Sequence, residues 1–298
     1  MFGSNIKVHF AGSDNSMPHT VAANLAGVNY SLFTCYPFLK GKKIDDDFTY
    51  GKEKIFVPRI IEGLRNHIIM DSGLFTLMFG AEKGKPQTVE SLTLWQDKTA
   101  KFLKQNALTC SVVEIDCQKI LGVKEAWYFR NRMREVMPNN RHINVFHLPD
   151  GMKGLDRLIE FSDYIAFSVP ELRISRRGTY REDLRQLVYY TKNRKPEIDI
   201  HLLGCTEKAL LQDNKFCSSA DSTSWLAANR YGRLGYKKYH VNDVKQSVRN
   251  KLQGDIIREF GKYQPCAVTQ KTIKYTQDAY LSAVIAKRKY ELLCGNQD

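Results

Sequence analysis

Three aspartates and one histidine stand where short apolar segments of this sequence end. Asp71 follows the segment Ile68–Met70, Asp116 and Asp221 occupy similar places, and His147 closes a fourth segment. Two carboxylates held at one rim can cleave a glycosidic bond, because one attacks the sugar carbon while the other transfers a proton. A lone aspartate at such a place is more often a helix cap or a turn residue. Chemistry is therefore expected only if the fold brings these side chains together.

A barrel of parallel strands would do so, because the carboxyl ends of its strands meet at one rim. The sequence contains short apolar runs, several rich in Val, Ile, Phe and Tyr, with helix-like stretches such as Ser91–Gln105 and Thr179–Tyr190 between most of them. The runs are Ile6–Ser13, Val28–Cys35, His67–Phe75, Cys110–Cys117, Ile143–Asp150, Tyr164–Glu171, Ile198–Cys205 and Ser218–Trp225. We therefore predict an α/β fold, a (β/α)₈ barrel of the TIM type. The alternative is an open doubly wound sheet, but no glycine-rich phosphate loop follows any run.

The chain has 298 residues and no linker rich in Ser, Gly and Pro, so one main domain is expected. We place the barrel at residues 1–240 and a helical, basic C-terminal extension, packed on the barrel, at residues 241–298. This extension could close the barrel or enlarge a binding surface. Seven scattered cysteines fit a reducing compartment. The sequence has neither a long apolar run nor a signal-peptide pattern, so we expect a cytoplasmic protein without membrane contact.

The charge of the chain favours a polyanionic partner. Its 45 Lys and Arg against 32 Asp and Glu give a formal net charge of +13 at pH 7, and such a field most commonly attracts nucleic acid. Two basic clusters follow the sixth and eighth runs: Arg173, Arg176, Arg177 and Arg181, then Arg230, Arg233, Lys237 and Lys238. Tyr231, Tyr236 and Tyr239 lie within the second cluster, and aromatic rings among basic residues can stack bases. A solvated charged face is the alternative for either cluster.

Four segments that contain these residues resemble, in order and spacing, motifs of the tRNA-guanine transglycosylases. Asp71-Ser72-Gly73-Leu74-Phe75 resembles their Asp-Ser-Gly-Gly-Phe signature, with Leu74 in place of the second glycine. Glu114-Ile115-Asp116 is similar to the segment with their guanine-reading aspartate, and His201-Leu202-Leu203-Gly204 is similar to their (Tyr/His)-Leu-(Met/Leu)-Gly strand. Ser219-Ala220-Asp221-Ser222, with Arg230 downstream, resembles the segment that carries their nucleophile.

The resemblance implies a base exchange in which guanine of a polynucleotide is replaced by a 7-deazaguanine through a covalent aspartyl-sugar intermediate. It implies that Asp221 is the nucleophile and Asp71 the general acid and base. Asp116 would accept hydrogen bonds from N1–H and the 2-amino group of guanine. His147 takes a position that contacts the base in the family, where glutamine is usual, and Ser72 would belong to the same pocket.

Three more residues are expected around the base and the sugar. Ser168 and Val169 could donate backbone N–H groups to the guanine carbonyl, and Gly204 could permit close approach of the sugar or base. The target nucleotide must leave its stack for this chemistry. The two basic clusters would then grip phosphates on either side of the flipped guanosine.

The family's zinc motif is missing from this chain. After Asp221 the sequence offers only Cys266, Cys294 and His240, whereas a closed structural zinc site needs four ligands. Zinc is therefore doubtful, and we expect no metal and no other cofactor. A short, basic chain without this motif resembles the phage-encoded branch that inserts 7-deazaguanines (a preQ0-like base) into DNA, so the expected partners are DNA and the free base.

Three other functions are possible on the same residues. They are a transglycosylase acting on tRNA, a non-catalytic nucleic-acid-binding subunit of such an enzyme, and a barrel glycoside hydrolase. The presence of both Asp71 and Asp221 argues against the second, and the positive charge argues against the third.

Overall fold

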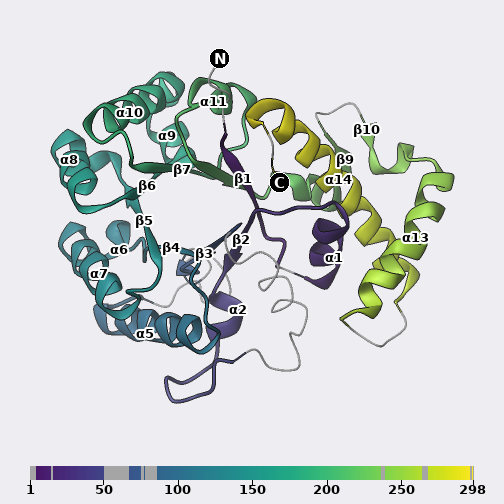
Figure 1. The fold of residues 1–298 in the computed structure, drawn as a ribbon, viewed down its shortest axis with the longest axis horizontal. Helices are drawn as coiled ribbons and strands as arrows, with labels where there is room; N and C mark the ends of the chain where they lie inside the picture. Colours follow the sequence, from purple (N-terminus) through teal and green to yellow (C-terminus); the bar gives the residue numbers. More distant parts are fainter. Residues whose placement is uncertain are drawn as a thin grey trace.

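The strands of the protein form a closed, eight-stranded barrel (Figure 1). The computed structural model describes residues 5–14, 16–49, 67–74, 77, 86–235, 239–263, 268–295 and 297. Each barrel strand pairs in parallel with the next along the chain, and β8 returns to β1. The barrel strands are β1 (Lys7–Ala11), β2 (Ser31–Thr34), β3 (Ile68–Asp71), β4 (Ser111–Val113), β5 (Arg141–Phe146), β6 (Tyr164–Ser168), β7 (Asp199–Leu203) and β8 (Ser219–Ser222). The predicted (β/α)₈ barrel is confirmed, and the open sheet is wrong.

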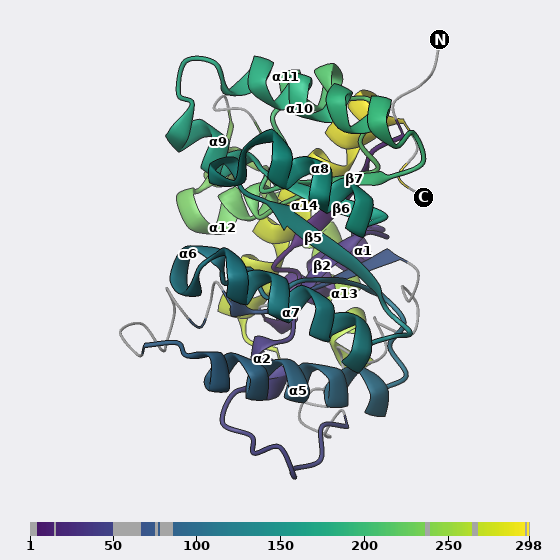
Figure 2. The same cartoon turned by 90° about the vertical axis from the view of Figure 1, so that its left-hand side faces the viewer.

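Helices cover the outside of the barrel, as the side view in Figure 2 shows for α5, α7, α8 and α10. The described α-helices are α1 (Met17–Leu25), α2 (Tyr36–Leu39), α5 (Val89–Gln105), α6 (Gln118–Leu121), α7 (Val123–Val136), α8 (Gly151–Phe161), α9 (Val169–Ser175), α10 (Tyr180–Arg194), α11 (Lys208–Asp213), α12 (Ala227–Tyr231), α13 (Gln246–Gly261) and α14 (Gln270–Cys294). Local sequence sets several of their ends. Thr88 caps α5 through a reciprocal pair of bonds with Ser91, and α7 ends two residues before Pro138. None of the helices in the described ranges is both long and apolar enough to cross a membrane.

Two apolar layers hold the barrel together. Outside the strands, side chains such as Ile165, Ile200 and Leu202 are fully buried in one large cluster with the covering helices. A smaller cluster joins Val113 of β4 and Val145 of β5 to side chains of β3 and β6. Since these side chains meet across four strands, they fill the interior of that half of the barrel. Strands buried on both faces explain why the runs are almost continuously apolar.

The C-terminal segment completes the helical ring. Helix α14 contacts both α1 and α11, and Ala279, Ala283 and Tyr290 from it join the large apolar cluster (Figure 1). Close to the end of the chain, the amide of Gln297 bonds to the backbone of Val8 and Ile6 at the start of the barrel. Helix α14 thus lies where the eighth helix of such a barrel belongs. The border at residue 240 stays a prediction.

Two short strands lie between β8 and α13 in the chain, and one of them contacts α14. They are β9 (Arg233–Leu234) and β10 (Tyr239–His240), which pair antiparallel. In the described ranges, turns of 3₁₀-helix follow β5 at Leu148–Asp150, β8 at Ser224–Leu226 and β10 at Val241–Asp243. Leu234 is buried with Ala228 and Val241 in a small apolar cluster of its own. This cluster anchors the segment after β8 beside α14.

Candidate active site

Asp221 is held at the end of β8 by donors from the neighbouring strand. The residue is 8% exposed and pairs with His9 in the β1–β8 ladder. Its Oδ1 accepts hydrogen bonds from the backbone N–H of Gly204 at 3.0 Å and from Nε2 of His201 at 3.1 Å. Both bonds fix the orientation of the carboxyl group. A buried, oriented carboxylate at a barrel rim is suited to attack a substrate carbon.

A row of polar groups continues from Asp221 into the barrel. Nδ1 of His201 contacts the hydroxyl of Ser219, which in turn contacts the hydroxyl of Tyr164. With Nε2–H donating to Asp221, His201 accepts from Ser219, and Ser219 accepts from Tyr164, so every group in the row is satisfied. His9 lies edge-on to His201, with ring centroids 6.2 Å apart. Burial, together with neighbouring His201, lowers the pKa of His9 to about 3, which leaves its ring neutral.

Asp71 ends β3 at the same rim and is electrostatically coupled to Asp221. Burial by the surrounding protein, with further contributions from the carboxylates of Asp221 and Asp116, raises the pKa of Asp71 from 3.8 to about 6, although hydrogen bonds from the backbone of Gly73 and Ser72 offset part of the rise. The bond from Gly73 N–H to Oδ2 is 3.0 Å long. A carboxyl with this pKa can both give and take a proton near neutral pH.

The turn after Asp71 depends on its glycine and on buried partners. Gly73 has a φ of +76°, and a Cβ there would come within 3.0 Å of the Cβ of Tyr36. Ser72 is 4% exposed, and its carbonyl oxygen accepts a bond of 2.8 Å from the indole N–H of Trp95. The Ser72 backbone therefore fixes the direction of the Asp71 side chain. Phe75, the last residue of the motif, lies outside the described residues.

Asp116 is the outer member of a row of three charged groups. Nε2 of His147 lies 2.6 Å from Oδ1 of Asp116, and Nδ1 lies 3.0 Å from Oε2 of Glu171. Burial opposes a charge on this ring, but the hydrogen bonds to Asp116 and Glu171 outweigh it and raise the pKa of His147 to about 10. Lys119 lies 3.4 Å from the same oxygen of Glu171. His147 is thus an imidazolium that donates to a carboxylate on each side.

This arrangement corrects the role expected for His147. The side chain is only 2% exposed, and both ring nitrogens are occupied by Asp116 and Glu171. It cannot present a nitrogen to a base in this geometry, so it orients Asp116 instead. The Asp116 side chain is 38% exposed, and among the described residues no donor bonds to its Oδ2. This oxygen remains open to a ligand at the rim.

Ser168, Val169 and Gly204, the residues expected around the base and the sugar, lie where β6 and β7 end. The hydroxyl of Ser168 caps α9 by accepting from the N–H of Glu171 at 3.3 Å. Val169 is the first residue of α9, so its N–H is not needed by the helix. Gly204 has a φ of +64°, and a Cβ there would lie 2.9 Å from Cγ of Pro170. The close approach at Gly204 is therefore to Pro170, and its N–H serves Asp221.

The two basic clusters differ in how they are held. Arg173 and Arg181 both form ion pairs with Glu207, that of Arg173 at 2.6 Å. Arg176 and Arg177 are exposed after α9. In the second cluster, Arg230 donates to Thr223 at 3.2 Å, and Arg233 is exposed on β9. Lys237 and Lys238, with Tyr236, lie outside the described residues.

No group of three or more His, Cys, Asp or Glu side chains within the described ranges is arranged to hold a metal ion. His240 instead uses Nδ1 to cap the turn at Asn242. Cys205 and Cys217 are buried free thiols, and Cys294 is fully buried. Cys266 lies outside the described ranges.

Known proteins give little further guidance. No protein-family model and no curated protein matches this chain. One solved structure with a similar arrangement is described as QR15, an aldolase; it is 11% identical, has a TM-score of 0.45, and covers 77% of this chain and 99% of its own. This likeness says nothing about activity, and the fold assignment rests on the strand order.

Several residues of the site give no sign in the sequence that they belong to it. Glu171 was visible only as the end of the sixth run, and nothing in the sequence placed it beside His147. His201 belongs to the segment His201-Leu202-Leu203-Gly204, but nothing in the sequence indicates its bond to Asp221. Tyr164 and Ser219 resemble ordinary strand residues. When both faces of a strand are buried, no alternation of polar and apolar residues shows which side chains point into the barrel.

Proposed function

We propose that the protein is a base-exchange transglycosylase that replaces guanine in DNA by a 7-deazaguanine. One observation carries the proposal: two carboxylates at one barrel rim are held in different ways. Asp221 accepts two hydrogen bonds that orient its carboxyl group, whereas burial and nearby carboxylates raise the pKa of Asp71 to about 6. Such a division is what an attacking group and a proton-transfer group require.

In the first half of the exchange, a carboxylate oxygen of Asp221 attacks C1′ of the target nucleoside. The bond from C1′ to the guanine nitrogen breaks, and its electron pair leaves with the base. Protonated Asp71 supplies the proton that the departing guanine needs. The sugar is then held as an ester of Asp221, as in retaining glycosidases.

The second half reverses these steps with another base. The ionised Asp71 takes the ring N–H proton of the incoming 7-deazaguanine, whose nitrogen then attacks C1′. Asp221 leaves as a carboxylate, which its bonds from Gly204 and His201 stabilise. Proton and charge return to their starting places, so the cycle needs no cofactor.

Base choice is assigned to Asp116. Guanine and 7-deazaguanine present N1–H and the 2-amino group side by side, and a carboxylate can accept both bonds. Oδ1 of Asp116 is fixed by cationic His147, and Oδ2 is open among the described residues. Adenine lacks this pair of donors, and a site built for such donors discriminates strongly against it. The N–H of Val169 is the candidate donor to the base carbonyl.

The polymer is inferred from charge. The net charge of +13 and the exposed Arg176, Arg177 and Arg233 favour a polyanion. DNA is preferred over tRNA because the zinc-bearing motif of the tRNA-directed family is missing from the sequence.

The test is incubation of the purified protein with isotopically labelled 7-deazaguanine bases and either DNA or tRNA at equal salt. We expect label in DNA and little in tRNA. Label in tRNA alone would replace DNA by tRNA as the substrate and leave the chemistry in place. Binding of both polymers with label in neither would indicate a non-catalytic subunit.

A further inference from the structure

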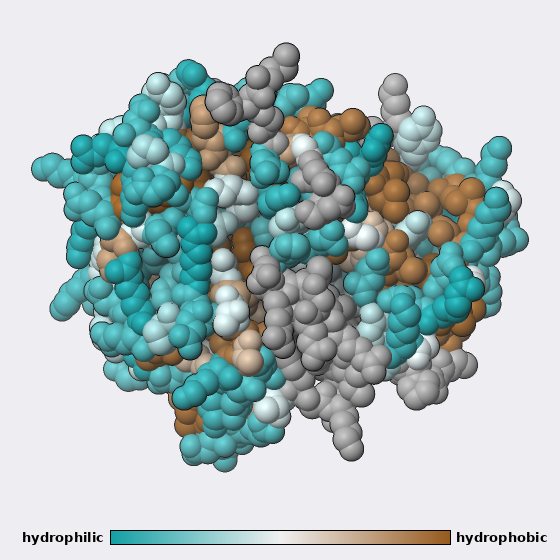
Figure 3. All heavy atoms as spheres, in the orientation of Figure 1, coloured by the Kyte–Doolittle hydropathy of each residue, from teal (hydrophilic) through white to brown (hydrophobic). Residues whose placement is uncertain are grey.

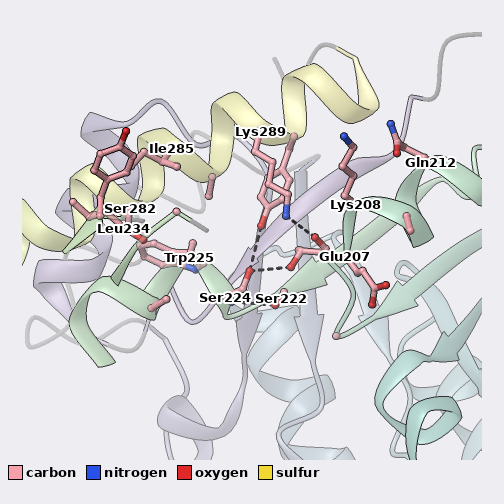
Figure 4. A pocket seen from close by; sticks show the side chains of 18 of the residues that line it. Glu207, Lys208, Gln212, Ser222, Ser224, Trp225, Leu234, Ser282, Ile285 and Lys289 are labelled. Carbon is pink, nitrogen blue, oxygen red and sulfur yellow. Dashed lines mark hydrogen bonds between the residues drawn. The ribbon is translucent and has the colours of Figure 1, made fainter. Parts of the chain in front are cut away.

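A cleft of about 1270 Å³ opens beside Asp221, and of its described lining residues only Gly204 takes part in the exchange chemistry described above (Figure 4). Its lining includes Gly204, whose N–H donates to Asp221, and Ser222, the residue that follows Asp221. From there it extends along α14, between the loop after β7 and the strands β9 and β10. A chain bound at Asp221 would therefore enter this cleft on leaving the rim.

One wall of the cleft is apolar and carries an exposed aromatic ring. Leu234 and Ile285 stand together on this side in Figure 4, with Trp225 below them. Tyr239 of β10 also lines the cleft and is 67% exposed. Figure 3 shows hydrophobic residues gathered over α14 on this side of the molecule. Exposed apolar and aromatic surface of this kind can hold the face of a nucleobase.

The opposite wall is basic. Of the described lining residues, four are cationic and one is a carboxylate: Arg173, Arg181, Lys208 and Lys289 against Glu207. Arg173 and Arg181 are paired with Glu207, and Lys289 donates to the carbonyl oxygen of Thr206 at 2.7 Å. Lys208 is exposed at the edge, beside Gln212 in Figure 4. The excess of positive charge suits a phosphate.

Hydroxyl groups line the floor between these walls. Oγ of Ser224 lies 2.9 Å from Oγ1 of Thr206 and 3.4 Å from the hydroxyl of Tyr290. The volume of the cleft exceeds the roughly 300–1,000 Å³ of a typical small-molecule pocket. An apolar wall, a basic wall and this size together fit a segment of a polymer better than a single small anion.

We propose that the cleft binds the single-stranded nucleotides that flank the target guanosine, with a base stacked on Tyr239 and a phosphate beside Lys208. The proposal rests on the base-exchange function, because that function supplies a nucleic-acid strand at Asp221. A flipped or single-stranded nucleotide leaves its neighbours unstacked, and stacking on an aromatic ring recovers part of the lost energy.

Matched pairs of surface variants test the two walls. Tyr239→Ala removes the stacking ring, and Tyr189→Ala is its control, since Tyr189 of α10 is 60% exposed but does not line the cleft. Lys208→Ala removes the phosphate contact, and its control is Lys215→Ala, an exposed lysine after the end of α11. A third pair is Ile285→Asp with Val284→Asp, adjacent residues of α14 that are 41% and 37% exposed, of which only Ile285 lines the cleft.

The measurement is fluorescence anisotropy with a labelled single-stranded DNA that contains one guanosine. We expect Tyr239→Ala and Ile285→Asp each to weaken binding by about fivefold or more. Lys208→Ala should lower the slope of log K against log salt by about 0.7. The three control variants should stay within about twofold of the unmodified protein. Circular dichroism of each variant establishes that it is folded.

A second arm replaces the nucleotides on one flank of the guanosine by abasic residues. On one of the two flanks this change should weaken binding to the unmodified protein but not to Tyr239→Ala, because the two changes remove the same contact. Equal losses in both proteins on both flanks would refute stacking on Tyr239.

The outcomes separate this proposal from the proposed function. If the unmodified protein transfers label into DNA and the cleft variants bind DNA like their controls, the cleft proposal alone is overturned. Weakened binding in the cleft variants, without exchange into any polymer, would overturn the exchange reaction and leave the cleft as a strand-binding site. Failure of the unmodified protein to bind the oligonucleotide would overturn the cleft proposal, and a bound protein or peptide would then be the occupant to test.

Discussion

Replacing Asp71 by asparagine should abolish base exchange and at the same time stabilise the protein. The folded state raises the pKa of Asp71 from 3.8 to about 6, chiefly through burial. Each pKa unit corresponds to about 1.4 kcal/mol, so keeping this carboxylate charged costs the fold about 3 kcal/mol at neutral pH. This cost already includes the bonds from the backbone of Gly73 and Ser72, and asparagine keeps the shape and a neutral acceptor, as the protonated carboxyl does. The expected gain is therefore about 3 kcal/mol.

The gain should depend on pH in a defined direction. The unfolded chain ionises Asp71 near its ordinary pKa of 3.8, whereas the folded protein ionises it only near 6. The unfolded state therefore binds fewer protons between these values, and this group makes the unmodified protein lose stability as pH rises from about 4 to 6. The variant lacks this slope. Its advantage should be absent near pH 4 and complete above about pH 7.

Chemical denaturation at a series of pH values measures this difference, and thermal unfolding should show an increase in Tm of about 5 °C at neutral pH. Asp45→Asn, at an exposed loop aspartate, is the control and should change stability little at any pH. If Asp71→Asn is less stable than the unmodified protein at pH 7.5, or if its advantage is the same at pH 4 and pH 7, burial does not raise the pKa of Asp71. Retained exchange activity in the variant would remove Asp71 from the mechanism.

Three further substitutions test the remaining assignments. Asp221→Asn should reduce exchange by about 10³-fold or more while DNA binding, followed by anisotropy, changes little, because the charge is needed for the covalent step; near-normal turnover would exclude Asp221 as nucleophile. Asp116→Asn should weaken binding of free 7-deazaguanine by about 2–4 kcal/mol in calorimetry, since it places a donor against the donors of the base; unchanged affinity would end this role. Glu171→Gln removes one of the two carboxylates that raise the pKa of His147 to about 10, so the pH at which base affinity falls should move down from about 10; an unmoved profile would show that Glu171 does not orient Asp116 through His147.

The barrel could be predicted because its strands are short, apolar and separated by helices of recognisable period. Asp71 illustrates this well: the apolar residues before it form β3, and it is the last residue of that strand. An apolar run does not by itself mark the end of its strand where polar residues follow. β4 ends at Val113, so Asp116 projects from the loop after the strand and needs His147 to orient it.

The side chains that contact the predicted site residues could not be predicted, because they come from different strands and helices. Glu171 reaches His147 across the boundary between β5 and β6. The polar row from Asp221 to Tyr164 runs through the barrel interior, where the sequence suggests only apolar packing. The cleft depends on residues more than 70 positions apart, since Lys208 and Ile285 face it from α11 and α14. Contacts of this kind depend on tertiary packing and leave no local pattern.

Trapping the covalent intermediate would show whether Asp221 attacks the sugar of the target nucleoside. The protein is incubated with a guanosine-containing DNA oligonucleotide without an incoming base, denatured, and analysed by intact-mass spectrometry and peptide mapping. We expect an adduct whose mass is that of the protein plus the oligonucleotide less one guanine. It should be attached at Asp221, be lost in Asp221→Asn and disappear when 7-deazaguanine is added. Exchange into DNA without any such adduct, or an adduct that persists in Asp221→Asn, would contradict attack by Asp221.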